Sequence, residues 1–175
     1  MKRLTLPLDE ETRKSLRAGE VVYLSGIIYT ARDAAHKMMK EALDKGEELP
    51  FDINGATIYY VGPTRARPGQ AIGSAGPTTS GRMDVYTPQL LDLGLKGMIG
   101  KGYRTQAVKD AIVANKAIYF IAAGGAGALL SKCIVESTMV AYPELLSEAV
   151  RRLKVVDFPV FVGIDALGND IYEEE

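Results

Sequence analysis

Two glycine-rich stretches hold most of the residues in this sequence that could bind an anion. The first, GPTTSGRMDVYTP at residues 76–88, carries neighbouring hydroxyls and Arg82, and the second, KGMIGKG at residues 96–102, contains Lys101. Hydroxyls, backbone amides and cations are costly to gather in one place unless something anionic lies among them. We therefore predict a small-anion site whose candidate binding residues are the hydroxyls of Thr78, Thr79 and Ser80 and the cations Arg82 and Lys101.

A second arginine, Arg32, falls in the first turn of a helix expected over residues 30–46, and Arg82 follows the threonines expected to cap the next helix. Helix N-termini attract anions through free N–H groups and the helix dipole. An arginine binds a carboxylate through two parallel hydrogen bonds. The two positions together predict two carboxylate clamps, although either one alone is equally consistent with a surface salt bridge.

Lys101 is preferred over Lys96 as the cation of the second stretch. Glycines flank Lys101 on both sides and permit close approach of a ligand. Helix capping explains one of the three hydroxyls of Thr78, Thr79 and Ser80, because one hydroxyl is enough to cap a helix.

The chain has one cysteine, Cys133, and one histidine, His36. A zinc or iron–sulfur site takes three or four ligands, so this chain cannot build one from its own cysteine. Cys133 lies among apolar residues, which predicts an inert buried thiol. His36 shares a helix face with Arg32 and is expected to be a structural partner.

Two nucleotide-binding patterns are incomplete. A phosphate-binding loop needs glycine where Leu95 stands and Ser or Thr where Gly102 stands. A dinucleotide fingerprint beginning at Gly125 needs a glycine where Leu130 stands. The glycines of AAGGAGALL are instead expected to turn a strand sharply into a helix.

The composition predicts one globular domain over residues 1–175. The formal net charge is −1 and the basic residues are scattered, which argues against nucleic acid as a partner. No apolar run approaches the roughly 20 residues needed to span a bilayer, and the N-terminus lacks an apolar signal core. We expect a cytoplasmic protein that does not contact membranes.

Strands alternate with helices along the chain. The expected strands cover residues 20–30, 56–63, 97–99 and 117–123, and the expected helices cover residues 30–46, 83–93, 103–117, 124–132 and 142–155. Residues 64–77 form a loop, and residues 158–174 are expected to be a hairpin that turns at Gly168–Asn169. This order predicts an α/β protein with a mixed sheet.

Local signals set the expected helix ends. Thr30 with Asp33 predicts a capping box, and Gly46 predicts the end of that helix. The threonines at 78–79 predict a cap for the helix over residues 83–93, which Pro88 could break. Pro143 fits the first turn of the helix over residues 142–155.

Five blocks together resemble a known family: TARDAAHK, GPTTSGRMD, KGMIGKG, AAGGAGALLSKCI and FPVFVGIDALGNDIY. In this order they resemble the beta subunit, or C-terminal domain, of iron–sulfur-dependent hydro-lyases, the class I fumarases and L-tartrate dehydratases. The resemblance covers nearly all of the chain after about Leu16. It implies a swivelling β/β/α domain.

The resemblance also implies a partner and a cofactor. A separate alpha subunit would carry a four-iron, four-sulfur cluster, with two copies of each subunit in the enzyme, and this chain indeed has no cysteines to spare for a cluster. Matched residue by residue, Arg32, Thr78, Arg82 and Lys101 would face the substrate. The cluster iron without a thiolate would act as a Lewis acid on the leaving hydroxyl.

The implied reaction is the reversible hydration of fumarate to L-malate, active only with the alpha subunit. Fumarate carries a carboxylate at each end, which suits Arg32 and Arg82, while Arg82 and Lys101 would stabilise charge that develops on the adjoining carboxylate. Thr78 is our hypothesis for the proton acceptor, because cations favour its alkoxide. The alternatives are an L-tartrate dehydratase beta subunit and a noncatalytic module that binds a dicarboxylate or another anion.

Overall fold

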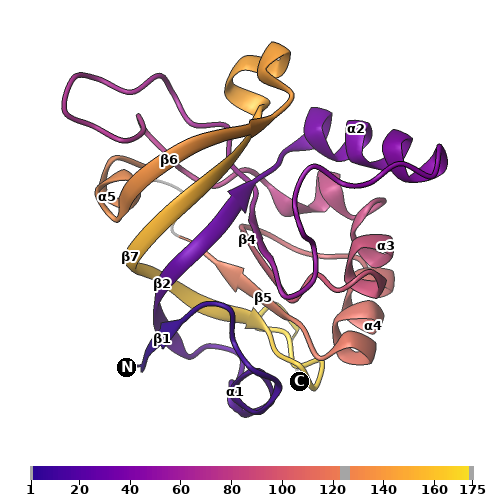
Figure 1. Ribbon diagram of the computed structural model, residues 1–175. Coiled ribbons are helices and arrows are strands. Elements are labelled where there is room, and N and C mark those ends of the chain that lie inside the picture. The colour runs from indigo at the N-terminus through magenta and orange to yellow at the C-terminus, as the bar shows by residue number, and fades with distance from the viewer. Residues whose placement is uncertain (1, 123–126, 174–175) are drawn as a thin grey trace.

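The computed structural model describes residues 2–122 and 127–173, and its strands form one mixed sheet in the order β1-β2-β3-β4-β5-β7-β6 (Figure 1). The first five strands pair in parallel, and β7 runs antiparallel to β2, β5 and β6. Their bounds are β1 Lys2–Thr5, β2 Val21–Thr30, β3 Thr57–Tyr59, β4 Gly97–Gly100, β5 Ile118–Ile121, β6 Ile134–Ala141 and β7 Val150–Ile164.

Strand β7 closes this sheet on itself. It pairs with β2 along most of its length and with β5 near its end, where Phe161 lies opposite both Val21 and Ile121. The strands β2, β3, β4, β5 and β7 thus form a closed cycle of hydrogen-bonded neighbours, which leaves only β1 and β6 beside it. Closure satisfies backbone groups that an open edge would leave unpaired.

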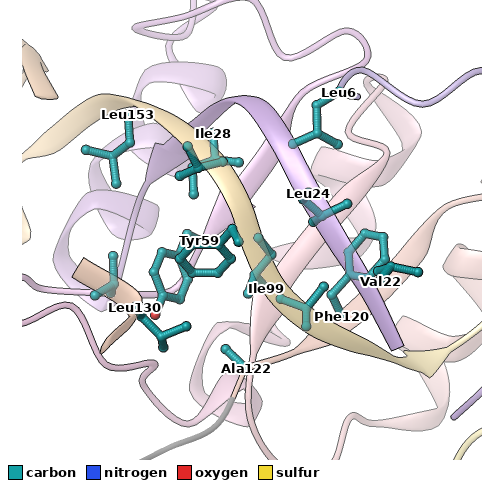
Figure 2. Packing of buried hydrophobic residues seen from close by; sticks show 14 of the residues in the cluster. Leu6, Val22, Leu24, Ile28, Tyr59, Ile99, Phe120, Ala122, Leu130 and Leu153 are labelled. Carbon is teal, nitrogen blue, oxygen red and sulfur yellow. The ribbon is translucent and has the colours of Figure 1, made fainter. Parts of the chain in front are cut away.

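The alternation of side chains along the strands builds two cores. In β5, Ile118 and Phe120 join one apolar cluster, whereas Tyr119 and Ile121 join the other. This is the period of two that an extended chain imposes. Figure 2 shows the first cluster, in which side chains of β2, β3, β4, β5 and β7 meet Leu130.

The second core lies between the sheet and three helices. These helices are α2 Asp33–Asp44, α3 Thr87–Asp92 and α4 Gln106–Asn115, which share one side of the sheet in Figure 1. The remaining helical segments are α1 Glu10–Ser15, α5 Gly127–Lys132 and the 3₁₀ turns η1 Ser80–Met83 and η2 Pro143–Glu148. The mixed α/β architecture with flanking helices is confirmed, and Gly125 of the rejected dinucleotide pattern lies outside the described residues.

The helix expected over residues 142–155 is wrong. The segment contains only the 3₁₀ turn η2, which begins at Pro143; Leu146 has a φ of 55° that a right-handed helix does not allow, and β7 begins at Val150. The apolar residues of this segment recur three and four positions apart, which suggests a helix, but Leu153 and Val155 point into the first core at strand spacing. Pairing with β2 and β6 decides the conformation. The expected hairpin keeps its turn near Gly168, but its second arm is a single bridge between Ile164 and Asp170.

The expected helix caps also need correction. Thr30 caps nothing: its hydroxyl donates to the Ala149 carbonyl at 3.1 Å and accepts from the Arg151 amide at 2.9 Å, so it joins β2 to the start of β7. Gly46, with φ of 72°, does follow the end of α2. Of the helix expected over residues 83–93, only α3 is α-helical, because η1 ends at Met83; Pro88 lies in the first turn of α3, where proline is tolerated.

A buried ion pair joins the starts of α3 and α4. The Arg104 side chain is fully buried, and its Nε lies 2.6 Å from Asp84 Oδ1. Its Nη2 donates to the Tyr60 and Thr87 hydroxyls, both at 3.1 Å. The other oxygen of Asp84 accepts the Thr105 amide at 2.7 Å. Every charge in this pair therefore has a partner, as a buried charge requires.

We predict that Arg104→Met lowers the free energy of unfolding by about 3 to 5 kcal/mol, because it leaves the Asp84 carboxylate buried and unpaired. Urea denaturation measures the change. The double variant Asp84→Asn with Arg104→Met should be less destabilised than the sum of its single variants. Lys40→Met, which breaks the exposed Lys40–Asp44 pair, is the matched control and should cost under about 0.5 kcal/mol. Equal losses in Arg104→Met and Lys40→Met would contradict the prediction.

Candidate functional site

The sequence-predicted residues meet at the carboxyl edge of three neighbouring parallel strands. Arg32 follows the end of β2, the segment 78–82 lies beside the ends of β3 and β4, and Lys101 directly follows β4. Loops and helix starts converge at the carboxyl ends of neighbouring parallel strands, and ligands of both closed and open α/β sheets bind there. The fold thus places Arg32, Thr78, Arg82 and Lys101 at one edge.

Backbone pairing holds the threonine segment against Lys101. The Thr78 amide donates to the Tyr60 carbonyl at 2.7 Å, just past the end of β3. Thr79 forms a parallel bridge with Lys101, and the Ser80 amide donates to the Lys101 carbonyl at 2.9 Å. Thr78 and Lys101 therefore occupy adjoining extended segments whose relative position is fixed by hydrogen bonds.

The buried Ser80 hydroxyl also links the segment at residues 78–82 to Lys101. The Lys101 amide donates to Ser80 Oγ at 3.0 Å, and Ser80 Oγ lies 2.8 Å from the Tyr119 hydroxyl, which donates to the Gly102 carbonyl at 2.9 Å. Because the single Tyr119 proton goes to Gly102, Ser80 is the donor to Tyr119. Burial raises the pKa of Tyr119, which keeps this donor protonated. A side chain at Gly100 would collide with Ser80, so glycine is required there.

Asp33 brings the two arginines together. Its Oδ2 lies 3.2 Å from Arg82 Nε, and its Oδ1 lies 3.9 Å from Arg32 Nε. Glu148 from η2 lies 4.0 Å from Arg32 Nε on another side. Arg32 is less exposed than Arg82, with 27% against 52% of the side chain accessible. Both arginines retain access to solvent and hence to a ligand.

Gly62 makes room for the Arg32 guanidinium. A Cβ built on Gly62 would lie 2.9 Å from Arg32 Nη1 and 3.3 Å from the Ser147 carbonyl. Gly62 comes shortly after β3, so the strand next to β2 shapes the space beside Arg32. Any larger residue at this position would displace the guanidinium.

Lys96 and Lys101, the two candidates for the anion-binding cation of this stretch, lie at opposite ends of β4. Lys96 precedes the strand, and its Nζ donates to the Asn115 carbonyl at 2.9 Å, away from the other site residues. Lys101 follows the strand and makes no side-chain hydrogen bond or ion pair within residues 2–122 and 127–173. The preference for Lys101 on the basis of its flanking glycines agrees with this placement.

Two details of the arginine prediction are corrected. Arg82 lies in the last turn of the 3₁₀ segment η1 and not at the N-terminus of an α-helix. Arg32 is the N-cap residue of α2 and lies just before its first turn. The N-cap of η1 is Thr79, whose side chain makes no capping hydrogen bond. The position of both arginines therefore depends on Asp33 and on the strand ends more than on helix dipoles.

The described part of the chain offers no ligand set for a metal. No group of three or more His, Cys, Asp or Glu side chains that could hold an ion occurs in residues 2–122 and 127–173. Cys133 is half-buried, and burial raises the pKa of its thiol, which fits the expected inert cysteine. Over the same residues, no helix is both long enough and apolar enough to cross a bilayer.

His36 supports Arg32 from within the protein. Its side chain is buried, and Nδ1 lies 2.8 Å from the Arg32 carbonyl, which can only accept, so Nδ1 carries the proton. Burial lowers the pKa of His36 to about 4, so the ring is neutral at pH 7. Its burial and its hydrogen bond to a backbone carbonyl agree with the expectation that His36 is a structural partner.

Sequence reasoning missed several residues that organise the site. Asp33 was assigned to a capping box, although it pairs with Arg82 instead. Ser80 was counted among surplus hydroxyls, and nothing in the sequence marks Tyr119 or Arg104. The excess of hydroxyls over capping needs was the only available signal, and it predicted anion binding, whereas the buried Ser80 hydroxyl bonds Tyr119 and the Lys101 amide.

A family model and three relatives show what the chain is similar to. A family model described as "Fumarase C-terminus" matches residues 2–175. The chain is 43% identical over 153 residues to "Fumarate hydratase class I, aerobic" of Escherichia coli K12, covering 86% of this chain and 28% of that protein. It is 42% identical over 175 residues to "Fumarate hydratase 2" of Leishmania major, covering 98% of this chain and 31% of that protein.

The third relative is of similar size. "Putative L(+)-tartrate dehydratase subunit beta" of Methanocaldococcus jannaschii is 37% identical over 173 residues, covering 95% of this chain and 89% of that protein. The chain therefore spans less than a third of the two fumarate hydratases but most of the tartrate dehydratase subunit.

The neutral, buried His36 predicts an acid-sensitive stability. Unfolded histidine has a pKa of 6.5 and folded His36 about 4, so only the unfolded chain gains this proton as pH falls between these values. The lost stability amounts to about 3 kcal/mol. His36→Asn keeps a donor for the Arg32 carbonyl but cannot titrate. Urea denaturation at pH 7 and pH 4.5 should show a larger loss in the wild type than in the variant, and equal losses would disprove this.

Proposed function

The chain belongs to the fumarase C-terminal family, and on this premise we propose that it supplies the dicarboxylate-binding residues of a hydro-lyase that interconverts fumarate and L-malate. The observation that carries the proposal is the convergence of Arg32, Arg82 and Lys101 at one sheet edge. The names of the fumarate hydratase relatives support the choice of substrate.

In this proposal the two arginines bind the two carboxylates. A guanidinium can hold a carboxylate through paired, charge-assisted hydrogen bonds. Arg32 enters the site from the start of α2, and Arg82 from η1 on the far side of Asp33. A short, rigid diacid fits this arrangement better than a monoacid, which would leave one cation without a partner.

Lys101 and Thr78 would act where the proton is lost. Dehydration of malate removes a proton from the carbon beside a carboxylate, while hydroxide leaves the neighbouring carbon. Lys101 and Arg82 would stabilise the negative charge that develops on that carboxylate. Thr78 Oγ would take up the proton as an alkoxide, which nearby cations favour, and return it in the reverse reaction.

The iron–sulfur cluster implied by the family does not fit the side chains described here, because they include no suitable ligand set. We propose that a separate alpha subunit carries the cluster, with two copies of each subunit in the enzyme. The match to a protein named subunit beta over 89% of its length supports a separate companion. The steps assigned to this chain concern only its own residues.

Three further statements belong to the same proposal. Residues 1–175 act as one domain, this domain is of the swivelling β/β/α type, and the enzyme is cytoplasmic. The closed strand cycle with helices on one side supports the domain type. The scattered charge supports a partner other than nucleic acid.

L-tartrate dehydration is the second candidate function. The tartrate dehydratase relative matches over most of its length, which favours this candidate more than the partial matches do. Tartrate differs from malate by one hydroxyl, and a pocket that hydrogen-bonds this group would discriminate strongly. A noncatalytic anion-binding module is the third candidate, since the arginines alone would serve it.

Anaerobic coexpression with a candidate alpha subunit tests the proposal. That subunit should be encoded nearby, be roughly 280 residues long as the family implies, and carry three cluster cysteines, the ligand count of a cluster with one open iron. The complex should convert malate to fumarate, whereas the purified chain should be colourless and inactive. Preference for tartrate would select the second candidate. Malate dehydration by the iron-free chain alone would refute the proposal.

We predict that Thr78→Ala lowers kcat of the complex by about 100-fold or more while KM changes little, because a lost proton acceptor affects the transition state. Thr79→Ala is the matched control: the neighbouring threonine is exposed, its side chain caps nothing, and its bridge to Lys101 uses the backbone. The control should keep kcat within about twofold. A Thr78→Ala enzyme with raised KM and unchanged kcat would assign Thr78 to binding only.

A further inference from the structure

Buried polar atoms without hydrogen-bond partners gather at the start of α2. In the described residues there are four such side-chain atoms, and Arg32 Nε, Asp33 Oδ1 and His36 Nε2 account for three of them. Buried polar groups are nearly always paired, and each unpaired one costs about 1 to 3 kcal/mol. Three such atoms lie within one helical turn. We therefore expect this turn to serve a function that offsets the cost to stability.

The Asp33 carboxylate faces both arginines, with one oxygen toward each. Oδ2 is 3.2 Å from Arg82 Nε, a contact that is satisfied as an ion pair. Oδ1 is 3.9 Å from Arg32 Nε, too far for a hydrogen bond, so both of these atoms remain unpaired. Asp33 thus approaches two guanidinium groups that belong to different segments of the chain.

Both contacts of Asp33 are to the Nε atom of the guanidinium and not to its terminal nitrogens. Asp33 approaches Nε, and none of the terminal nitrogens of Arg32 or Arg82 makes a hydrogen bond to any residue in the described ranges. The paired terminal nitrogens are the ones that grip a carboxylate in two-point fashion. A carboxylate placed at Nε therefore orients an arginine without occupying the nitrogens that a ligand needs.

We propose that Asp33 is a positioning residue that holds Arg32 and Arg82 in one cluster and orients their free nitrogens toward the two ends of a diacid. The inference rests on the proposed function and adds a residue to it. Asp33 offsets the repulsion between the two cations, and its fixed place on α2 sets the separation of the two carboxylate grips.

Glu148 provides a matched control. Its carboxylate lies 4.0 Å from Arg32 Nε and accepts the Ala34 amide at 3.2 Å, so it also faces the start of α2. It makes no ion pair with Arg82 in the described part of the chain. Glu148→Gln and Asp33→Asn each remove one negative charge beside Arg32, but only the second removes the connection between the arginines.

The sign of the change in KM separates positioning from simple charge. Neutralising an acid beside a cationic site should by itself strengthen anion binding and lower KM. If Asp33 positions the arginines, Asp33→Asn raises KM for malate in the assembled enzyme by roughly fivefold or more, while Glu148→Gln leaves KM unchanged or lowered. Asp33→Glu should recover part of the loss. An unchanged or lowered KM in Asp33→Asn overturns the proposal.

A second measurement does not depend on activity. Each arginine Nε–H gives its own nitrogen–proton NMR signal in the purified chain, assigned with Arg32→Lys and Arg82→Lys. Asp33→Asn should move the signals of both Arg32 and Arg82, whereas Glu148→Gln should move that of Arg32 alone. An unmoved Arg82 signal in Asp33→Asn overturns the proposal even if the enzyme is active. If Asp33→Asn moves the signals of both arginines but the wild-type complex has no hydro-lyase activity, the proposed reaction is refuted. The role of Asp33 in organising the two arginines is then still supported.

Discussion

The pairing of β7 with both β2 and β5 is the constraint on which the rest of this structure depends. Its first residues lie between β6 and β2, and its last residues reach β5, so one strand connects the outer two of the neighbouring parallel strands β2, β3, β4 and β5. The parallel strands can then end at a common edge without exposing an open flank. The Thr30 hydroxyl adds a direct connection between the end of β2 and the start of β7, next to Arg32.

The edge created in this way carries charge of both signs. Arg32, Arg82 and Lys101 face it, while Asp33 and Glu148 offset part of their charge. These three cations outnumber the two acids, so this edge is locally cationic although the chain has a formal net charge of −1. Beneath the edge, the fully paired Arg104 and the Ser80–Tyr119 contact fix the backbone, so that the exposed cations extend from a rigid base.

The sequence predicted the elements whose pattern is local. The sequence predicted the strand β2, the buried strand β5 and the glycine after α2, because each depends on neighbouring residues. The concentration of cations and hydroxyls and the family resemblance also selected Arg32, Thr78, Arg82 and Lys101, which the fold places at one sheet edge.

What the sequence did not reveal depends on partners far along the chain. The start of β7 was predicted as a helix because the apolar residues from Leu145 to Leu153 recur at helical spacing, whereas pairing with β2 and β6 on either side makes it a strand. Strand β6 has a mostly exposed face without clear alternation, and β1 is short. Asp33 was read as a cap because its true contact, Arg82, comes from another segment.

Strand β4 has only four residues, with Lys96 at one end and Lys101 at the other. An insertion or deletion within it would turn every following side chain to the opposite face and shift Lys101 by about 3.3 Å out of line with Thr79. Position 100 is a further constraint, because a side chain there would collide with Ser80. The span from 97 to 101 must therefore keep its length for Lys101 to stay beside Thr79.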